Sequence, residues 1–104
     1  MAVIQATEAT FKKEIESGVT LVDFYTDGCG PCKMLAPVLD KLAAEISGVA
    51  KIVKVNAQEA PTLAREFKIM AVPTLILFKD GKEVKQTMGF KEKEELRSFI
   101  EENM

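Results

Sequence analysis

The strongest constraint on the fold is the segment at residues 20–26, Thr-Leu-Val-Asp-Phe-Tyr-Thr, a nearly unbroken run of apolar and β-branched side chains. A strand with one face in water alternates apolar and polar residues, whereas a continuous apolar run is typical of a strand buried on both faces. Such a strand lies in the middle of a sheet that is covered by other elements on both sides. We therefore predict an α/β fold with residues 20–26 as its central strand.

The remaining segments alternate between strand and helix patterns. Further strands are predicted at residues 3–6, 51–55, 74–79 and 83–88, and Asp80-Gly81 joins the last two into an antiparallel hairpin. Helices are predicted at residues 8–16 with Thr7 as N-cap and Ser17-Gly18 as stop, at 31–47 with a kink at Pro37, at 61–67 and at 92–103. This order predicts a mixed sheet with helices on both faces.

The last predicted helix, residues 92–103, carries Leu96, Phe99 and Ile100 on one face. Its other face holds a run of Lys and Glu, which we interpret as a solvated surface without a function of its own.

Composition limits the domain organisation and the chemistry. A chain of 104 residues that is 47% hydrophobic can bury one core but not two, so we expect one domain over residues 1–104. The chain has no His, which excludes Ser-His and Cys-His nucleophiles, a His general base and His metal ligands.

Charge and hydropathy indicate the surroundings of the protein. A net charge of −2 argues against binding to nucleic acid or to an anionic membrane surface. The first eight residues contain no basic side chain, and no segment is apolar enough for a signal peptide or a membrane span. We expect a monomer in the reducing cytoplasm.

In that compartment, two cysteines three positions apart are more typical of a redox or metal site than of a permanent disulfide.

The motif Cys29-Gly30-Pro31-Cys32 lies between the central strand and the predicted second helix. Two cysteines at this spacing can come within disulfide reach with little backbone movement. Cys29 precedes the first turn, where unpaired N–H groups and the helix dipole favour its thiolate, while Cys32 lies inside the helix and is more covered. We therefore expect Cys29 to attack a substrate disulfide and Cys32 to be the resolving thiol.

A zinc site is the alternative for this spacing. A closed site with four ligands needs two more Cys or His, and the chain has neither. A site shared between two copies, or completed by carboxylates, stays open at this point. We expect no metal and no cofactor.

Several motifs together resemble the thioredoxin family. They are Val-Asp-Phe-Tyr at residues 22–25, Cys-Gly-Pro-Cys-Lys-Met-Leu-Ala-Pro at 29–37, Ala-Val-Pro-Thr-Leu-Ile-Leu-Phe-Lys-Asp-Gly at 71–81, and Gly89. Their order and spacing match the family from about Ile4 to the last helix. The resemblance implies the thioredoxin fold, with five strands in a mixed sheet and four flanking helices. It also implies a general dithiol reductant of protein disulfides that receives electrons from a thioredoxin reductase.

The resemblance also assigns a role to two charged residues. Asp23 corresponds to a buried carboxylate that exchanges a proton with the resolving thiol, and Lys54 to its lysine partner. Asp23 is unusual on its own account, because an acid within an apolar strand pays a desolvation penalty unless its pKa rises or a partner is near. The alternatives are an acid at a wet strand end for Asp23 and an ordinary solvent-facing lysine for Lys54.

A substrate-binding patch is implied in the same way. Pro73 matches the proline that follows a cis peptide bond and faces the disulfide in this family. Together with Gly30, Pro31, Val72 and Gly89, it would form a flat apolar patch on which an extended substrate segment pairs through its backbone. A patch built from backbone and small residues suits many different substrates.

The direction of electron flow and the choice of partners rest on fewer residues. Oxidising and isomerising relatives carry a His between the cysteines, whereas Gly30 and Pro31 add no charge, which favours a reductant. The family usually has Trp where this chain has Gly28 and often another where it has Tyr25. These departures leave the identity of the reductase and the targets open. A disulfide oxidant or isomerase, and a binding subunit without catalysis, remain as alternatives.

Overall fold

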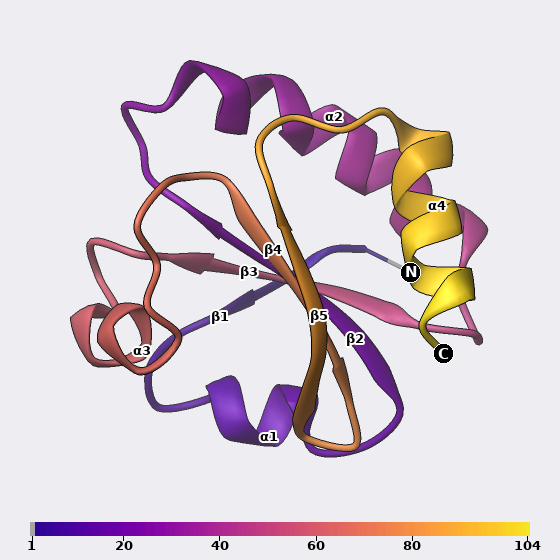
Figure 1. The fold of residues 1–104 in the computed structure, drawn as a ribbon, viewed down its shortest axis with the longest axis horizontal. Coiled ribbons are helices and arrows are strands. Elements are labelled where there is room, and N and C mark those ends of the chain that lie inside the picture. The colour runs from indigo at the N-terminus through magenta and orange to yellow at the C-terminus, as the bar shows by residue number, and fades with distance from the viewer. Residues whose placement is uncertain (1) are drawn as a thin grey trace.

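The computed structural model describes residues 2–104 as a five-stranded sheet with four helices (Figure 1). The strands are β1 (Ile4–Ala6), β2 (Val19–Tyr25), β3 (Lys51–Asn56), β4 (Thr74–Lys79) and β5 (Lys82–Met88), and the helices are α1 (Phe11–Ile15), α2 (Gly30–Glu45), α3 (Pro61–Glu66) and α4 (Lys93–Glu102). The strand order is β1-β3-β2-β4-β5. β1, β3 and β2 are parallel, whereas β4 pairs antiparallel with both β2 and β5. The predicted mixed α/β sheet with β2 at its centre is confirmed.

The two faces of the sheet carry separate hydrophobic clusters. On the face covered by α1 and α3, Val22 and Phe24 of β2 pack among aromatic side chains that include Phe11 and Phe78. On the face covered by α2 and α4, Leu21 of β2 packs in a cluster dominated by leucines. Side chains alternate along a strand, so Asp23 lies on the same face as Leu21, beneath α2.

The start of the first helix differs from the prediction. α1 begins at Phe11 with Thr10 as its N-cap, so the prediction that Thr7 caps this helix is wrong. The Thr7 hydroxyl accepts a hydrogen bond from the Thr10 backbone N–H at 3.3 Å, and its carbonyl accepts one from Phe11 at 3.0 Å. Thr7 therefore closes a separate turn before the helix, which sequence alone does not distinguish from a cap.

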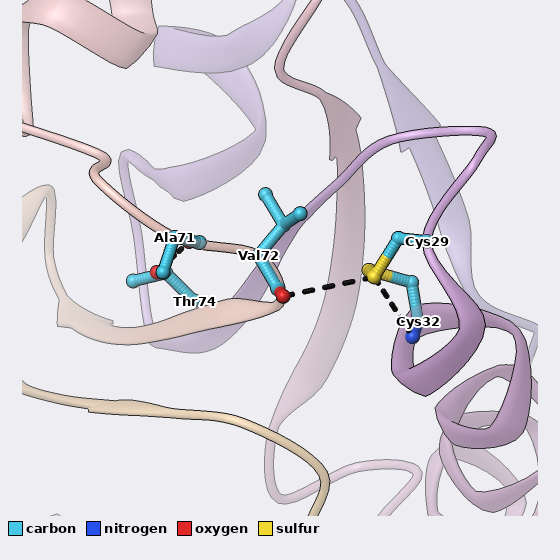
Figure 2. Close-up of a disulfide and its surroundings, with 5 residues drawn as sticks. All are labelled: Cys29, Cys32, Ala71, Val72 and Thr74. Atoms are coloured by element: carbon cyan, nitrogen blue, oxygen red, sulfur yellow. Dashed lines mark hydrogen bonds between the residues drawn. A yellow bond between two sulfur atoms is a disulfide. The ribbon is translucent and has the colours of Figure 1, made fainter.

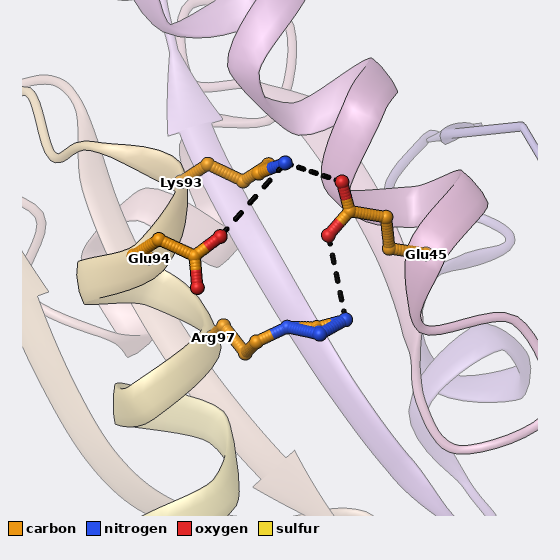
Figure 3. Close-up of polar contacts among 4 residues, drawn as sticks. All are labelled: Glu45, Lys93, Glu94 and Arg97. Carbon is orange, nitrogen blue, oxygen red and sulfur yellow. Dashed lines mark hydrogen bonds and ion pairs between the residues drawn. The ribbon is translucent and has the colours of Figure 1, made fainter.

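The charged face of α4 is more than a solvated surface. Lys93 forms an ion pair with Glu45 of α2, and Arg97 Nη2 lies 3.4 Å from Glu45 Oε1 (Figure 3). The hydrogen bond from Lys93 and the two positive charges lower the pKa of Glu45. Beneath these pairs, Leu96 and Ile100 are buried against the sheet. Two of the predicted solvated charges thus link α4 to the helix that carries the cysteines.

Candidate active site

The two cysteines lie at the N-terminal end of α2, as predicted. Cys29 is the N-cap residue of the helix, and its Sγ accepts a hydrogen bond from the Cys32 backbone N–H at 3.1 Å (Figure 2). The two side chains form a disulfide with their Cα atoms 5.2 Å apart. Pro31 occupies the first turn, where its missing N–H costs no helical hydrogen bond.

The two sulfurs have unequal surroundings. Cys32, within the first turn of the helix, is 5% exposed, whereas Cys29 is half-buried. The N–H that points at Cys29 Sγ is one of the donors that a helix N-terminus leaves free, and it favours negative charge on that sulfur. The predicted difference in burial is confirmed, and the favoured thiolate is the more accessible of the two.

A loop from the other half of the chain faces the disulfide. The carbonyl oxygen of Val72 faces Cys29 Sγ (Figure 2), and the two atoms are 3.6 Å apart. The peptide bond between Val72 and Pro73 is cis. The Gly89 N–H donates to the Pro73 carbonyl at 2.9 Å, and Gly89 has a φ of +88°, a conformation that favours glycine. The structure thus places the Val72 carbonyl next to Cys29, and Gly89 is hydrogen-bonded to the residue that follows Val72.

Asp23 is buried beneath α2. It is 0% exposed, so the alternative of a wet strand end is wrong. Neither carboxyl oxygen has a hydrogen-bond partner among residues 2–104. Burial raises the pKa of Asp23 from 3.8 to about 7, although the nearby charge of Lys54 opposes the rise. The side chain can therefore gain or lose a proton near neutral pH.

Lys54 is adjacent to Asp23 but its ammonium group contacts a different side chain. The two residues are partners in the β2–β3 ladder. The Lys54 Nζ lies over the Tyr25 ring, 4.6 Å from its centroid, a distance typical of a cation–π contact. In the described part of the chain no ion pair within 4 Å joins Lys54 to Asp23. Lys54 is half-buried rather than simply solvent-facing, and its charge reaches Asp23 from a distance.

The sequence analysis did not predict that Tyr25 contacts Lys54. The Tyr25 hydroxyl donates to Gln5 Oε1 at 3.1 Å, and the Gln5 side-chain amide donates to the Lys54 carbonyl at 3.3 Å. Strand alternation could have indicated that Tyr25 lies near Asp23, because residues two positions apart lie on one face of a strand. The identity of the neighbour on β3 could not be obtained without the register.

A small hollow lies beside Cys32 and Lys54. It has a volume of about 140 Å³ and is lined by Tyr25, Thr26, Asp27, Cys32, Lys33, Ala36 and Lys54. Cys32 and Lys54 share its wall, so a water molecule can lie between them, whereas Asp23 does not line the hollow. Within residues 2–104, no three His, Cys, Asp or Glu side chains gather closely enough to hold a metal ion.

Comparison with known proteins agrees with this geometry. The family model named Thioredoxin matches residues 2–102. The chain belongs to the thioredoxin family. It is 46% identical to thioredoxin of Staphylococcus aureus strain Mu50 and 47% identical to thioredoxin of Staphylococcus saprophyticus, over 104 residues and the full length of each. It is therefore a thiol-disulfide oxidoreductase with a redox-active cysteine pair, and protein-disulfide reduction is the general activity of such proteins.

Gly28 stands where the resemblance described above implies a Trp. Its φ lies outside the left-handed region, and a Cβ built on it meets no atom within 4 Å. The backbone therefore does not require glycine there.

In the described residues, no helix has both the length and the apolar character needed to cross a bilayer.

Proposed function

We propose that this thioredoxin-family protein is a general dithiol reductant of protein disulfides, with Cys29 as nucleophile and Cys32 as resolving thiol. The observation that carries this assignment is the hydrogen bond from the Cys32 N–H to Cys29 Sγ at the end of α2. It favours a thiolate on the half-buried cysteine, while the partner that must act second is kept from solvent.

The reaction has two exchange steps. The Cys29 thiolate attacks one sulfur of the substrate, so that a bond from Cys29 to that sulfur forms, the substrate disulfide breaks and its other sulfur leaves as a thiolate. The Cys32 thiolate then attacks Cys29 Sγ and expels the first substrate sulfur. Two electrons pass to the substrate, which takes up two protons to become a dithiol, and Cys29 and Cys32 are left as the disulfide.

Asp23 and Lys54 are proposed to manage the proton of Cys32. The resolving thiol must lose its proton before it attacks, and a carboxylate whose pKa is about 7 is suited to accept one near neutral pH. The hollow lined by Cys32 and Lys54 provides space for a water on the Cys32 side of this pathway. Lys54 supports the ionised form of Asp23 through its charge.

Substrate binding is proposed at Gly30, Pro31, Val72, Pro73 and Gly89. Gly30 and Pro31 are exposed in the first turn of α2, and the Val72 carbonyl faces Cys29. An extended substrate segment next to Val72 would form backbone hydrogen bonds that do not depend on its side chains. This arrangement suits many protein substrates.

The expected working form is a cytoplasmic monomer, with residues 1–104 acting as one domain. Electrons are expected from a thioredoxin reductase, which restores the dithiol after each reaction.

Insulin reduction tests the proposed activity. The protein should accelerate the precipitation of insulin by dithiothreitol severalfold or more, because insulin precipitates when its interchain disulfides are reduced. A binding subunit without catalysis would give no acceleration. Equilibration in glutathione buffers then separates a reductant from an oxidant or isomerase, since a reductant remains largely disulfide-bonded at glutathione ratios that leave an oxidant reduced.

Gly28→Trp should change partner choice much more than stability. Because Gly28 needs no special backbone conformation and a side chain there has open space, we expect the free energy of unfolding to change by less than about 1 kcal/mol. Insulin reduction with dithiothreitol should stay within a few fold. The kcat/KM with which a reductase acts on this protein should rise for reductases adapted to a Trp-bearing partner, relative to the cognate reductase. The change should correspond to about 1–3 kcal/mol.

The measurements are urea unfolding and kinetics with the cognate and a foreign thioredoxin reductase. A collapse of the unfolding midpoint would show that the fold needs glycine at position 28. Unchanged kcat/KM with both reductases would show that this position does not contribute to docking.

A further inference from the structure

The loop that faces the disulfide has few hydrogen bonds of its own. At one end the Ile69 N–H donates to the Ala64 carbonyl at 2.8 Å, and at the other the Pro73 carbonyl accepts from Gly89 at 2.9 Å. Between these two anchors, among residues 2–104, the loop backbone meets the body of the fold at the Val72 carbonyl, 3.6 Å from Cys29 Sγ, and through one hydrogen bond to the sheet. It runs from Thr74 Oγ1 to the Ala71 carbonyl at 2.6 Å (Figure 2).

Thr74 is itself held firmly. It is the first residue of β4 and is only 2% exposed. In the sheet it is paired with Phe24 of β2 on one side and with Met88 of β5 on the other. Its branched side chain has few alternative rotamers in this setting. The hydroxyl is therefore a fixed point, whereas residues 70–72 lie outside helices and strands.

We propose that Thr74 is a positioning residue for disulfide exchange. Its hydroxyl holds the Ala71 carbonyl, and this keeps the next residue, Val72, with its carbonyl 3.6 Å from Cys29 Sγ. The hydroxyl bonds to Ala71 and acts on the reaction through Val72. The inference deepens the proposed function and rests on it, because it concerns how the loop receives a protein substrate.

The effect on binding can be separated from any effect on folding. Ala71 is an exposed residue of the loop, so its carbonyl can turn to solvent when Thr74 no longer holds it. Valine has nearly the shape of threonine and suits a buried strand position. Thr74→Val should therefore fold, while the loop loses the bond that sets its place. A substrate that pairs with the loop backbone should then react more slowly, and a small disulfide that needs only Cys29 should not.

The experiment measures second-order rates of the pre-reduced protein with two disulfides, insulin and the small chromogenic dithiodipyridine. Thr74→Val should reduce insulin about tenfold more slowly, an effect in the range of one lost hydrogen bond. Its rate with dithiodipyridine should stay within twofold of the unchanged protein. Thr74→Ser retains the hydroxyl and should stay within twofold on both substrates.

Thr20→Val is the matched control. Thr20 is also a fully buried threonine in the sheet, but its Oγ1 has no hydrogen-bond partner in the described structure. It pairs with Lys51 and Phe78, away from the disulfide loop. The same chemical change should leave both rates within twofold and should not lower stability, since it removes an unpaired buried hydroxyl.

Three results would overturn the inference: an unchanged insulin rate in Thr74→Val, an equal loss on both disulfides, or a comparable loss in Thr74→Ser. If Thr74→Val does not fold, Thr74→Ser and Thr74→Ala form the deciding pair, and equal insulin rates in these two overturn it. If the unchanged protein reacts with dithiodipyridine but not with insulin, the proposed function fails and the inference fails with it. An active unchanged protein with an equally active Thr74→Val refutes only the inference.

Discussion

Cys29→Ser will abolish the reduction of protein disulfides, whereas Cys32→Ser will still attack and will remain linked to its substrate. The reason is the unequal placement of the two sulfurs. The Cys29 sulfur is half-buried and receives an N–H hydrogen bond at 3.1 Å, while Cys32 is 5% exposed. Without Cys32 the mixed disulfide cannot be resolved from within the protein. A pull-down from cell extract, separated without reductant, measures the trapped complexes.

The double variant with both cysteines changed to serine is the control for binding without exchange. Complexes that disappear on adding dithiothreitol, found only with Cys32→Ser, are the expected pattern. Trapping by Cys29→Ser instead would show that the nucleophile and the resolving thiol are exchanged in our assignment.

Asp23→Ala should be more stable than the unchanged protein at pH 8 and should lose that advantage in acid. Burial raises the pKa of Asp23 from 3.8 to about 7. A group with a raised folded pKa stabilises fully below its unfolded pKa, and this contribution is lost as the pH rises through the folded value. Ionised Asp23 is thus a net cost at pH 8. A shift of about three pKa units corresponds to about 4 kcal/mol, an upper limit because alanine leaves a small cavity.

Urea unfolding of the disulfide form from pH 4 to pH 8.5 measures this difference, which should grow mainly between pH 4 and pH 7. Asp40→Ala, at an exposed position on α2, serves as control and should show no such growth. In the same variant set, Asp23→Ala should slow the resolution of the mixed disulfide. A stability difference that is flat with pH, together with unchanged resolution, would contradict both the burial argument and the proton-transfer role.

The sequence predicted those parts of the site that depend on local pattern. The apolar run of β2 indicated a central strand, and this alone made Asp23 conspicuous as an acid in the core. The spacing of Cys29 and Cys32 at a helix start indicated both their proximity and their unequal burial. These inferences need only the periods of strands and helices, which are properties of consecutive residues.

Contacts between elements were beyond such patterns. The Lys54 ammonium lies over Tyr25 because of two things, the register between β2 and β3 and the rotamers of the two side chains. Neither can be obtained from a short stretch of sequence. The link from Glu45 to Lys93 and Arg97 depends on how α4 packs beside α2. Thr74 carried a weaker signal, since it is a hydroxyl at the start of an otherwise apolar run, but its partner Ala71 became evident only from the loop geometry.

The contact between Cys29 and Val72 joins residues 43 positions apart in the chain. A ribosome adds about 5–20 residues per second, so the cysteine motif is made seconds before the loop that faces it. During that interval the nascent chain holds two thiols but lacks the loop that we propose for substrate binding. The loop takes its place beside Cys29 only when β4 has been synthesised and pairs with β2. The two cysteines can therefore react with thiols and disulfides of the cell before the loop that faces them is in place.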